Sequence, residues 1–548
     1  MACSLLSRGE RGSRPALGLE DRVIPRHFRI SMRCLLSVCS AALLLASGCG
    51  DAFVGCPDGY EGDPCAWSGG FRDPELTDPS AWSASSSEVA ILPDATGLGP
   101  GLASFAPSVV CNAGSLAQIV QMPPSEDADP FVLEITYRAD EVNGVDVYYG
   151  RAFRTLPVTF GRWATERFCL GEAAYGGPVT FEVLASERFQ DCFGSPMGTI
   201  DVDRLEILVA EPGECPPANA VSNGSAELDG GGWSFELDVL RLGEAAASLE
   251  AGVGKDGTSG ARLYKAAGSQ KLAGMRTQVS VPLPSSLPSP ALRFWWKASG
   301  WTYQVQIGAY PGLRTILYPL GTLLPSEGAQ VNTYCLPPWT HGNVVDLSFI
   351  LKGGFFADEA ELVVDQVELL SDPKCGDSPD ILDPDFEAAP NEWPGVIETR
   401  VSDPVVKLVR DPDRAGPSGD GFLEFSYSDN QLLVDANTWV WIPRSEGDRG
   451  PQLRYYSNVP VDPGVAVETF VGRSFVGQPV NTLETGGGWR PHAECLPPQW
   501  ADRWFRFRVS IGSAVPPEEV VVFDGPKRVL IDDIQLRLDG SCPTGAPQ

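Results

Sequence analysis

The stretch VLIDDIQLRLDGSC, from Val529 to Cys542, shows how this chain is built. Apolar and polar residues alternate around Asp532 and are followed by a turn and a cysteine, as expected for a strand with one buried face. A close counterpart, LVVDQVELLSDPKC, runs from Leu362 to Cys375, and a looser one, IDVDRLEILVAEPGEC, from Ile200 to Cys215. Three such closing strands predict three copies of one module.

Length and composition agree with several β-rich modules. A chain of 548 residues is too long for one core and suggests about three or four domains. The 59 glycines and 48 prolines indicate frequent turns, which favours many short strands over helices. A net charge of -30 argues against nucleic acid as a partner, because its phosphates would be repelled.

The first fifty residues indicate export. A short apolar run from Leu35 to Ala46 precedes Ser47, Gly48 and Cys49, and it is too short to cross a bilayer. We therefore interpret residues 1–48 as a signal region, with Met32 as an alternative start. The residues before Cys49 resemble a bacterial lipoprotein signal, which implies cleavage there and lipidation of the cysteine. We expect a lipid-anchored protein of the bacterial cell envelope, facing outward or into the periplasm.

The remaining chain divides into a tether and three modules. Residues 49–68 form the tether, and CPDGYEGDPC within it resembles the closing loop of an EGF-like domain. The modules cover residues 69–217 (module 1), 218–377 (module 2) and 378–548 (module 3). Each has an alternating segment in its middle: LEITYR at 133–138, LRFWWK at 292–297 and LRYY at 453–456. These segments predict equivalent strands.

The repeated modules carry the pattern of a known family over nearly all of residues 69–543. Its parts are an opening with Asn223, Glu227 and Trp233, the strand LRFWWKA at 292–298, and the closing strand VLIDDIQL at 529–536. These motifs resemble carbohydrate-binding modules of the galactose-binding-like β-sandwich superfamily. The resemblance implies an all-β protein with three tandem jelly-roll-like β-sandwich modules. Because that fold hosts many ligands, sugar binding has to be argued from the site.

The resemblance also implies a structural calcium ion in modules 2 and 3. An acidic residue of the opening segment and the aspartate of the closing strand would help to bind it: Glu227 with Asp365, and Glu387 with Asp532. Carboxylate oxygens suit Ca²⁺. Module 1 has Thr77 in place of the glutamate. The alternative is that these carboxylates only face solvent.

Ten cysteines follow Cys49, and an even number in an exported protein favours disulfides over metal binding. The repeat suggests one bridge at the end of each module, the tether holds a local bridge, and the last pair follows by exclusion. The expected pairs are Cys169 with Cys215, Cys335 with Cys375, Cys495 with Cys542, Cys56 with Cys65, and Cys111 with Cys192.

The chain offers little for catalysis. After the signal region it has only His341 and His492, both in turn-like contexts, so we expect exposed loop histidines. A nucleophilic centre of the Ser/His/Asp type would need one of them. We therefore predict no catalytic residues and a protein that is not an enzyme.

Outward-pointing aromatic residues are the candidate binding site. In the segment Trp439 to Ile442 the valine and isoleucine match apolar positions of the other modules, so Trp439 and Trp441 should share the outer face. A pyranose ring has an apolar face that stacks on such rings. We predict a ligand-binding face of Trp439, Trp441, Arg454 and Tyr456 in module 3, with Trp295 in module 2. The alternative is that a loop or a neighbouring module covers these side chains.

Two functions remain after these steps. The first is non-catalytic binding of glycan or polysaccharide at the cell surface through tandem modules. The second is a structural or adhesive envelope protein that uses the same modules for contacts with other envelope proteins.

Overall fold

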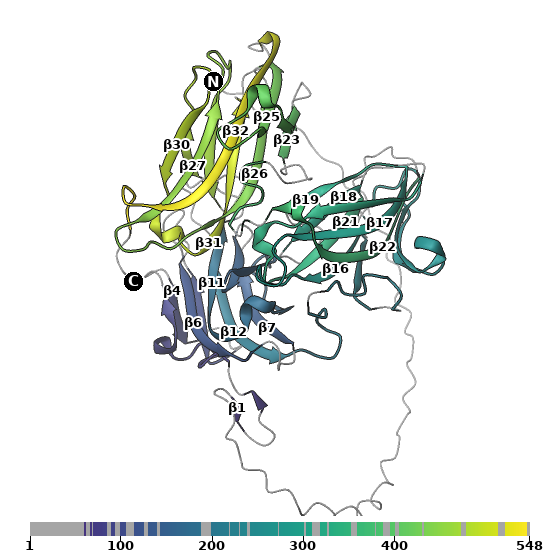
Figure 1. Ribbon diagram of the computed structural model, residues 1–548. Helices are drawn as coiled ribbons and strands as arrows, with labels where there is room; N and C mark the ends of the chain where they lie inside the picture. The colour runs from purple at the N-terminus through teal and green to yellow at the C-terminus, as the bar shows by residue number, and fades with distance from the viewer. Residues whose placement is uncertain are drawn as a thin grey trace, which may run out of the picture. The chain divides into compact units, whose positions relative to one another are not determined.

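Strands dominate the computed structural model (Figure 1). It describes residues 60–544, apart from 62–65, 68–69, 85–88, 94–98, 106–113, 125–129, 140–142, 188–198, 219, 229–230, 238–241, 272, 301–302, 309–317, 326–327, 352–358, 377, 379, 387–394, 400–404, 430–431, 473–477 and 513–520. Within these residues the helices are three-residue 3₁₀ turns: η1 (Pro79–Ala81), η2 (Glu172–Ala174), η3 (Lys255–Gly257), η4 (Pro338–Thr340), η5 (Pro373–Cys375), η6 (Pro412–Arg414) and η7 (Pro498–Trp500).

Residues 69–217 contain two five-stranded antiparallel sheets. We call the sheet that contains the first strand of a module its front sheet and the other sheet its back sheet. The front sheet has the order β3 (Ser83–Ala84), β6 (Ser115–Met122), β11 (Gly177–Glu187), β8 (Asn143–Tyr149) and β9 (Ala152–Leu156). The back sheet has the order β4 (Val89–Pro93), β5 (Gly101–Phe105), β12 (Ile200–Val209), β7 (Phe131–Ala139) and β10 (Ala164–Cys169).

Residues 218–377 repeat this strand order. The front sheet consists of β13 (Trp233–Leu237), β16 (Ala273–Ser280), β21 (Val344–Leu351), β18 (Tyr303–Gly308) and β19 (Tyr318–Leu323). The back sheet consists of β14 (Ala245–Glu250), β15 (Gly260–Lys265), β22 (Ala360–Ser371), β17 (Pro290–Ser299) and β20 (Gln330–Cys335).

Residues 378–548 repeat it again. The front sheet consists of β23 (Gly395–Thr399), β26 (Leu432–Ile442), β31 (Arg503–Gly512), β28 (Val467–Gly472) and β29 (Gln478–Thr482). The back sheet consists of β24 (Val405–Arg410), β25 (Gly421–Asp429), β32 (Val522–Asp539), β27 (Gly450–Asn458) and β30 (Arg490–Cys495). A two-stranded sheet of β1 (Tyr60–Glu61) and β2 (Ala66–Trp67) precedes the modules.

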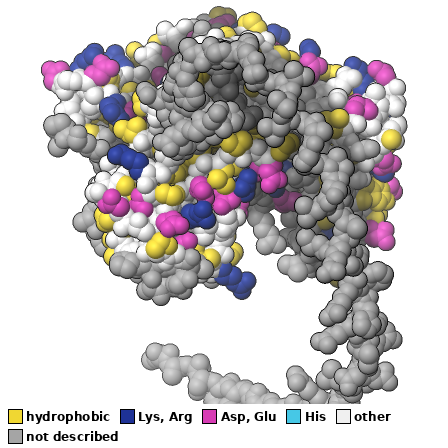
Figure 2. All heavy atoms as spheres, turned by 90° about the horizontal axis from the view of Figure 1, so that it is seen from below, with side chains coloured by type: hydrophobic (Ala, Val, Ile, Leu, Met, Phe, Trp, Pro, Cys, Tyr) yellow, Lys and Arg dark blue, Asp and Glu magenta, His cyan; other side chains and the backbone are white. Residues whose placement is uncertain are grey.

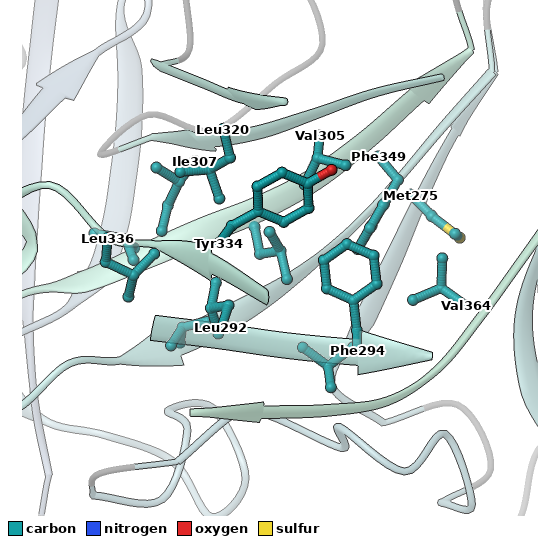
Figure 3. Packing of buried hydrophobic residues seen from close by; sticks show 14 of the residues in the cluster. Met275, Leu292, Phe294, Val305, Ile307, Leu320, Tyr334, Leu336, Phe349 and Val364 are labelled. Atoms are coloured by element: carbon teal, nitrogen blue, oxygen red, sulfur yellow. The ribbon is translucent and has the colours of Figure 1, made fainter. Parts of the chain in front are cut away.

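The space between the two sheets of a module is filled by apolar side chains from both. Figure 3 shows this in module 2, where Phe294 of the back sheet meets Phe349 of the front sheet edge to face at 5.1 Å. Both rings are fully buried. This packing of two antiparallel sheets is an all-β sandwich, as predicted.

The closing strands β12, β22 and β32 lie in the middle of the back sheets, and their aspartates Asp203, Asp365 and Asp532 are buried. A glycine approaches each carboxylate closely. A Cβ atom at Gly254 would lie 2.7 Å from Asp365 Oδ2, and one at Gly416 would lie 1.9 Å from Asp532 Oδ2. The segments facing Asp365 and Asp532 therefore need a residue without a side chain.

Three predicted disulfides are present. They join Cys169 to Cys215, Cys335 to Cys375, and Cys495 to Cys542. The pairs Cys56 with Cys65 and Cys111 with Cys192 lie outside the described residues, as does Cys49. Among the described residues, no helix is long and apolar enough to cross a membrane.

Candidate ligand-binding face

The front sheet of module 3 carries a grid of polar and aromatic side chains on the side away from its own core, and several of them, among them Asp435, Asn437 and Trp504, are buried. Strand β26 buries Val434, Ala436 and Val440 in that core, so the alternate residues point outward. The pairing of β26 with β31, and of β31 with β28, aligns the outward residues in rows. The rows are Asp435, Ser510 and Glu468; Asn437, Arg508 and Phe470; Trp439, Arg506 and Gly472; and Trp441 with Trp504.

Two arginine–aromatic pairs lie in this grid. The Arg508 guanidinium carbon lies 4.2 Å from the centre of the Phe470 ring, and that of Arg506 lies 4.9 Å from the centre of the Trp439 ring. Arg508 also approaches Asp435, with 3.6 Å between Nη1 and Oδ2. Burial lowers the pKa of Arg508 from its usual value, while the nearby carboxylates oppose this change. The face therefore combines flat apolar rings with charged donors and acceptors.

Trp439 and Trp441 point outward from the core of module 3, as the alternation predicted. The expectation that they form an open platform is wrong, however, because Trp441 is only 9% exposed. Trp441 belongs to a buried apolar cluster that also contains Phe153 of module 1, and Trp439 packs against that cluster. Trp441 meets Trp504 of β31 edge to face, and the ring of Trp439 lies 5.6 Å from Phe153 of module 1. The alternative named above, a covering neighbouring module, is what the structure shows.

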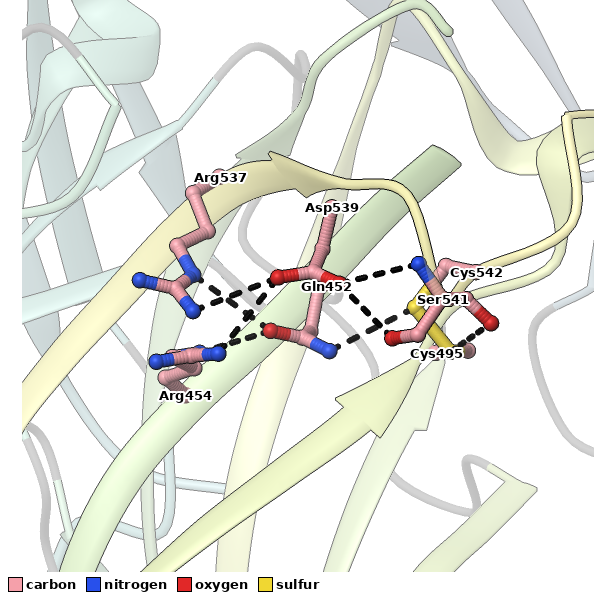
Figure 4. A network of polar contacts seen from close by, with 7 residues as sticks. All are labelled: Gln452, Arg454, Cys495, Arg537, Asp539, Ser541 and Cys542. Atoms are coloured by element: carbon pink, nitrogen blue, oxygen red, sulfur yellow. Dashed lines mark hydrogen bonds and ion pairs between the residues drawn. A yellow bond between two sulfur atoms is a disulfide. The ribbon is translucent and has the colours of Figure 1, made fainter. Parts of the chain in front are cut away.

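Arg454 and Tyr456 lie on a different sheet from the tryptophans. They belong to β27 of the back sheet, whereas Trp439 and Trp441 belong to β26 of the front sheet, so the structure does not bring the four residues together. Figure 4 shows Arg454 in a polar network beside the last disulfide. Its Nε donates to Gln452 Oε1 at 2.6 Å, and its Nη2 lies 3.4 Å from Asp539 Oδ2. The prediction that these side chains point away from the core was correct within each strand. The prediction that all four lie on one face of module 3 was wrong.

Trp295 lies on β17, in the back sheet of module 2, and is half-buried. It pairs with Val331, whose side chain is 58% exposed. The structure thus places Trp295 on the sheet equivalent to that of Arg454 and Tyr456, away from the front sheets.

The front sheet of module 2 presents a more polar version of the same grid. Arg276 lies opposite Ser348, and Ser348 lies opposite Gln306. The Nη2 atom of Arg276 lies 3.7 Å from Glu236 Oε1 on the neighbouring edge strand. Asp346, one row further along, pairs with an arginine of module 1.

The predicted calcium residues of module 2 converge on the turn at residues 255–259. Asp365 Oδ2 accepts from the Lys255 amide at 2.9 Å and from the Thr258 hydroxyl at 2.8 Å, and Glu227 Oε1 accepts from the Ser259 amide at 2.9 Å. Both carboxylates therefore already have protein donors. Within the described residues, no group of three or more His, Cys, Asp or Glu side chains is arranged so that it could hold a metal ion, so calcium would need backbone carbonyl ligands.

In module 3 the equivalent aspartate has the same kind of surroundings. Asp532 accepts from the amide and hydroxyl of Ser418 and, at 2.7 Å, from the Asp533 amide. Burial raises its pKa, and these hydrogen bonds oppose the rise. Glu387, the expected second ligand, lies outside the described residues.

Neither histidine is the exposed loop residue that the sequence suggested. His341 is 7% exposed and its Nδ1 lies 3.0 Å from the Pro282 carbonyl oxygen. His492 lies on β30, is half-buried, stacks on Tyr455 at 4.9 Å, and its Nε2 contacts Ser457 Oγ at 2.7 Å. Ser457 is itself 1% exposed.

Arg506, Arg508 and Phe470 are the site residues that sequence reasoning missed. The segment RWFRFRVSIG alternates in the same way as the tryptophan segment, with Phe505 and Phe507 in the core. The signal was therefore present in the sequence. What it could not show is that this strand pairs with β26.

Comparison with solved structures finds carbohydrate-binding modules with β-sandwich folds among the neighbours. The module TmCBM61, solved with β-1,4-galactotriose, matches at 13% identity and a TM-score of 0.21, covering 25% of this chain and 97% of that one. The tandem CBM22-1–CBM22-2 domain of Xyn10C from Paenibacillus barcinonensis matches at 11% identity and a TM-score of 0.20, covering 59% of this chain and 98% of that one.

An enzyme domain is also among the neighbours. The enzymatically active domain of tailspike protein 4 from bacteriophage CBA120 matches at 12% identity and a TM-score of 0.19, covering 26% of this chain and 19% of that one. No protein-family model and no curated protein matches the chain.

Proposed function

We propose that this chain binds glycans without catalysis, at the outward face of the module 3 front sheet. One observation carries the proposal: two arginine–aromatic pairs, Arg508 with Phe470 and Arg506 with Trp439, lie in adjacent rows of the sheet. A sugar ring needs a flat apolar surface for its C–H face and convergent donors and acceptors for its hydroxyl groups. This face carries both kinds of group, with Phe470 as its partly exposed ring, because Trp439 also packs against Phe153 of module 1.

The surface charge is compatible with a hydroxylated ligand. Figure 2 shows acidic and basic side chains interspersed on the face that is in view. Asp435 and Asn437 are only 6% and 5% exposed, so Arg508, whose side chain is 17% exposed, is the more accessible polar group in these two rows. Fixed polar groups of this kind determine orientation and specificity in ligand sites.

The test is titration of the whole protein with neutral and acidic polysaccharides, followed by tryptophan fluorescence. Arg508→Gln removes a charged donor, whose hydrogen bonds are worth about 1.5–3 kcal/mol, so affinity should fall roughly ten- to hundredfold. Phe470→Leu keeps the apolar volume but removes the ring and should also weaken binding.

A matched variant on the back sheet distinguishes the two faces. Arg454→Gln removes the same kind of side chain from β27, so it should leave binding unchanged. If Arg454→Gln abolishes binding while Arg508→Gln does not, the front-sheet site is refuted. If no polysaccharide binds, the adhesive function, in which the same modules contact envelope proteins, becomes the better proposal.

The proposal also includes attachment to the cell envelope and binding of calcium. The lipid anchor would be carried by Cys49 and would hold the protein on the cell envelope. Calcium is proposed beside Glu227 and Asp365, and beside Asp532, where the carboxylates come close to backbone turns. Its role there would be structural, as the resemblance to carbohydrate-binding modules implies.

A further inference from the structure

The front sheet of module 1 has an outward face that is apolar and covered. Tyr148, Phe153 and Leu184 alternate with residues of the module 1 core, yet each is at most 5% exposed. They belong to the same apolar cluster as Trp441 and Trp504 of module 3. This face corresponds by strand order to the grid described above for module 3. In module 1 this face packs against other parts of the protein instead of facing solvent.

Arg151, in the turn between β8 and β9, joins module 1 to module 3. Its guanidinium lies 4.5 Å from the Trp441 ring centre and 5.4 Å from the Trp504 ring centre. Its carbonyl accepts the indole N–H of Trp504 at 2.8 Å, and its Nη2 lies 2.6 Å from Asp380 Oδ1. A second ion pair joins Arg503 of module 3 to Glu182 of module 1 at 2.5 Å. A backbone hydrogen bond, cation–ring contacts and ion pairs therefore all join module 1 to module 3 around Arg151.

The same strands of module 1 contact module 2 through buried polar groups. Tyr149 Oη donates to Asn343 Oδ1 at 2.6 Å, and Asn343 Nδ2 donates to the Phe153 carbonyl at 2.9 Å. Arg154 pairs with Asp346 at 2.7 Å, and both side chains are about 95% buried. Such contacts resemble the inside of a domain more than a flexible link between domains.

Modules 2 and 3 also meet directly at this junction. The rings of Trp339 and Trp439 lie 6.3 Å apart, and the Phe153 ring lies within 5.6 Å of both. Residues 56–548 accordingly form one compact unit.

We infer that the front sheet of module 1 is an internal docking surface, which holds modules 2 and 3 in one fixed arrangement and does not bind glycan itself. Three tethered modules would move independently and bind a polymer through effective concentration. A junction with apolar packing and paired charges instead makes the three modules unfold together. The sheet face that is proposed to bind glycan in module 3 is an interface in module 1, where it packs against the Trp441 and Trp504 end of the module 3 face.

A charge-swap experiment on the whole chain tests this inference without any ligand. Wild-type protein should melt by calorimetry in a single transition. Arg503→Glu places two carboxylates face to face at Glu182, so it should split the melt, with the first transition at least about 5 °C lower. The double variant Glu182→Arg with Arg503→Glu restores the pairing and should restore the single transition. The matched control, Arg167→Ala, removes two ion pairs within module 1, with Glu134 and Glu214, and should leave the melt unsplit.

A milder variant keeps the test informative if charge reversal prevents folding. Trp504→Phe retains a buried ring but loses the N–H that donates to the Arg151 carbonyl, so it should also separate the transitions. The inference is overturned if the wild-type protein already melts in resolved steps, or if the double swap melts like the single variant. Because the melting experiment uses no glycan, its result tests the docking of the modules independently of the proposed glycan binding.

Discussion

Replacing Asp346 by asparagine probes the buried ion pair between modules 1 and 2. Arg154 Nη2 and Asp346 Oδ2 are 2.7 Å apart, and the two side chains are 5% and 4% exposed. The variant removes the negative charge and leaves Arg154 buried without its partner. Breaking a buried pair in this way costs about 3–5 kcal/mol. Glu166 also attracts Arg154 electrostatically, so we expect the lower end, about 3 kcal/mol.

The measurement is urea unfolding of the whole protein, with the free energy of unfolding taken from curves of equal slope. Glu368→Gln is the matched control, because it breaks a pair with Arg293 whose side chains are 49% and 47% exposed. An exposed pair of this kind contributes about 0–1 kcal/mol. The double replacement Arg154→Met with Asp346→Leu should be about as stable as wild type, since a well-packed apolar pair often equals a buried ion pair. If Asp346→Asn costs no more than Glu368→Gln, then the pair is not buried in solution and the described packing of modules 1 and 2 is wrong.

Three further predictions address other parts of the chain. Burial lowers the pKa of His492, so below pH 6.5 the unfolded chain binds a proton that the folded chain does not; the free energy of unfolding should fall as pH drops through 6.5 and below, and less so in His492→Gln, as followed by urea midpoints. Replacing Cys495 and Cys542 by alanine opens a loop with a sequence separation of 47 and should cost about 4 kcal/mol, measured against wild type under oxidising conditions. Cys49→Ser should move the protein from the membrane fraction to the soluble fraction, and a variant that still sediments with membranes would contradict lipid anchoring.

Much of the fold follows from local patterns that are visible in one chain. The alternation around Asp365 and Asp532 identifies buried strands because successive side chains of a strand point to opposite sides. The repeat then aligns Cys335 with Cys495 and Cys375 with Cys542, and this is enough to predict both bridges. The same alternation correctly turned Trp439 and Trp441 away from the core of their own module.

Two features of the site depend on contacts that no local pattern encodes. Whether Trp439 shares a sheet with Arg506 or with Arg454 depends on strand pairing across long sequence separations, and consecutive strands β26 and β27 in fact belong to opposite sheets. Whether an outward tryptophan is open depends on what packs against it, and Phe153, which covers Trp439, is nearly three hundred residues earlier in the chain.

The sequence by itself determined the strand faces, the all-β class and the bridges at the module ends, because these depend on side-chain period and on spacing that repeats along the chain. Only the tertiary structure decided what packs against each of the three equivalent faces. Module 1 carries Tyr148 and Phe153 on its front face and module 3 carries Asp435 and Arg508, yet a tyrosine in an alternating strand reads the same whether it meets solvent, sugar or protein. That choice follows from the complementary surface that another module presents, which is a property of the folded chain and not of any one segment.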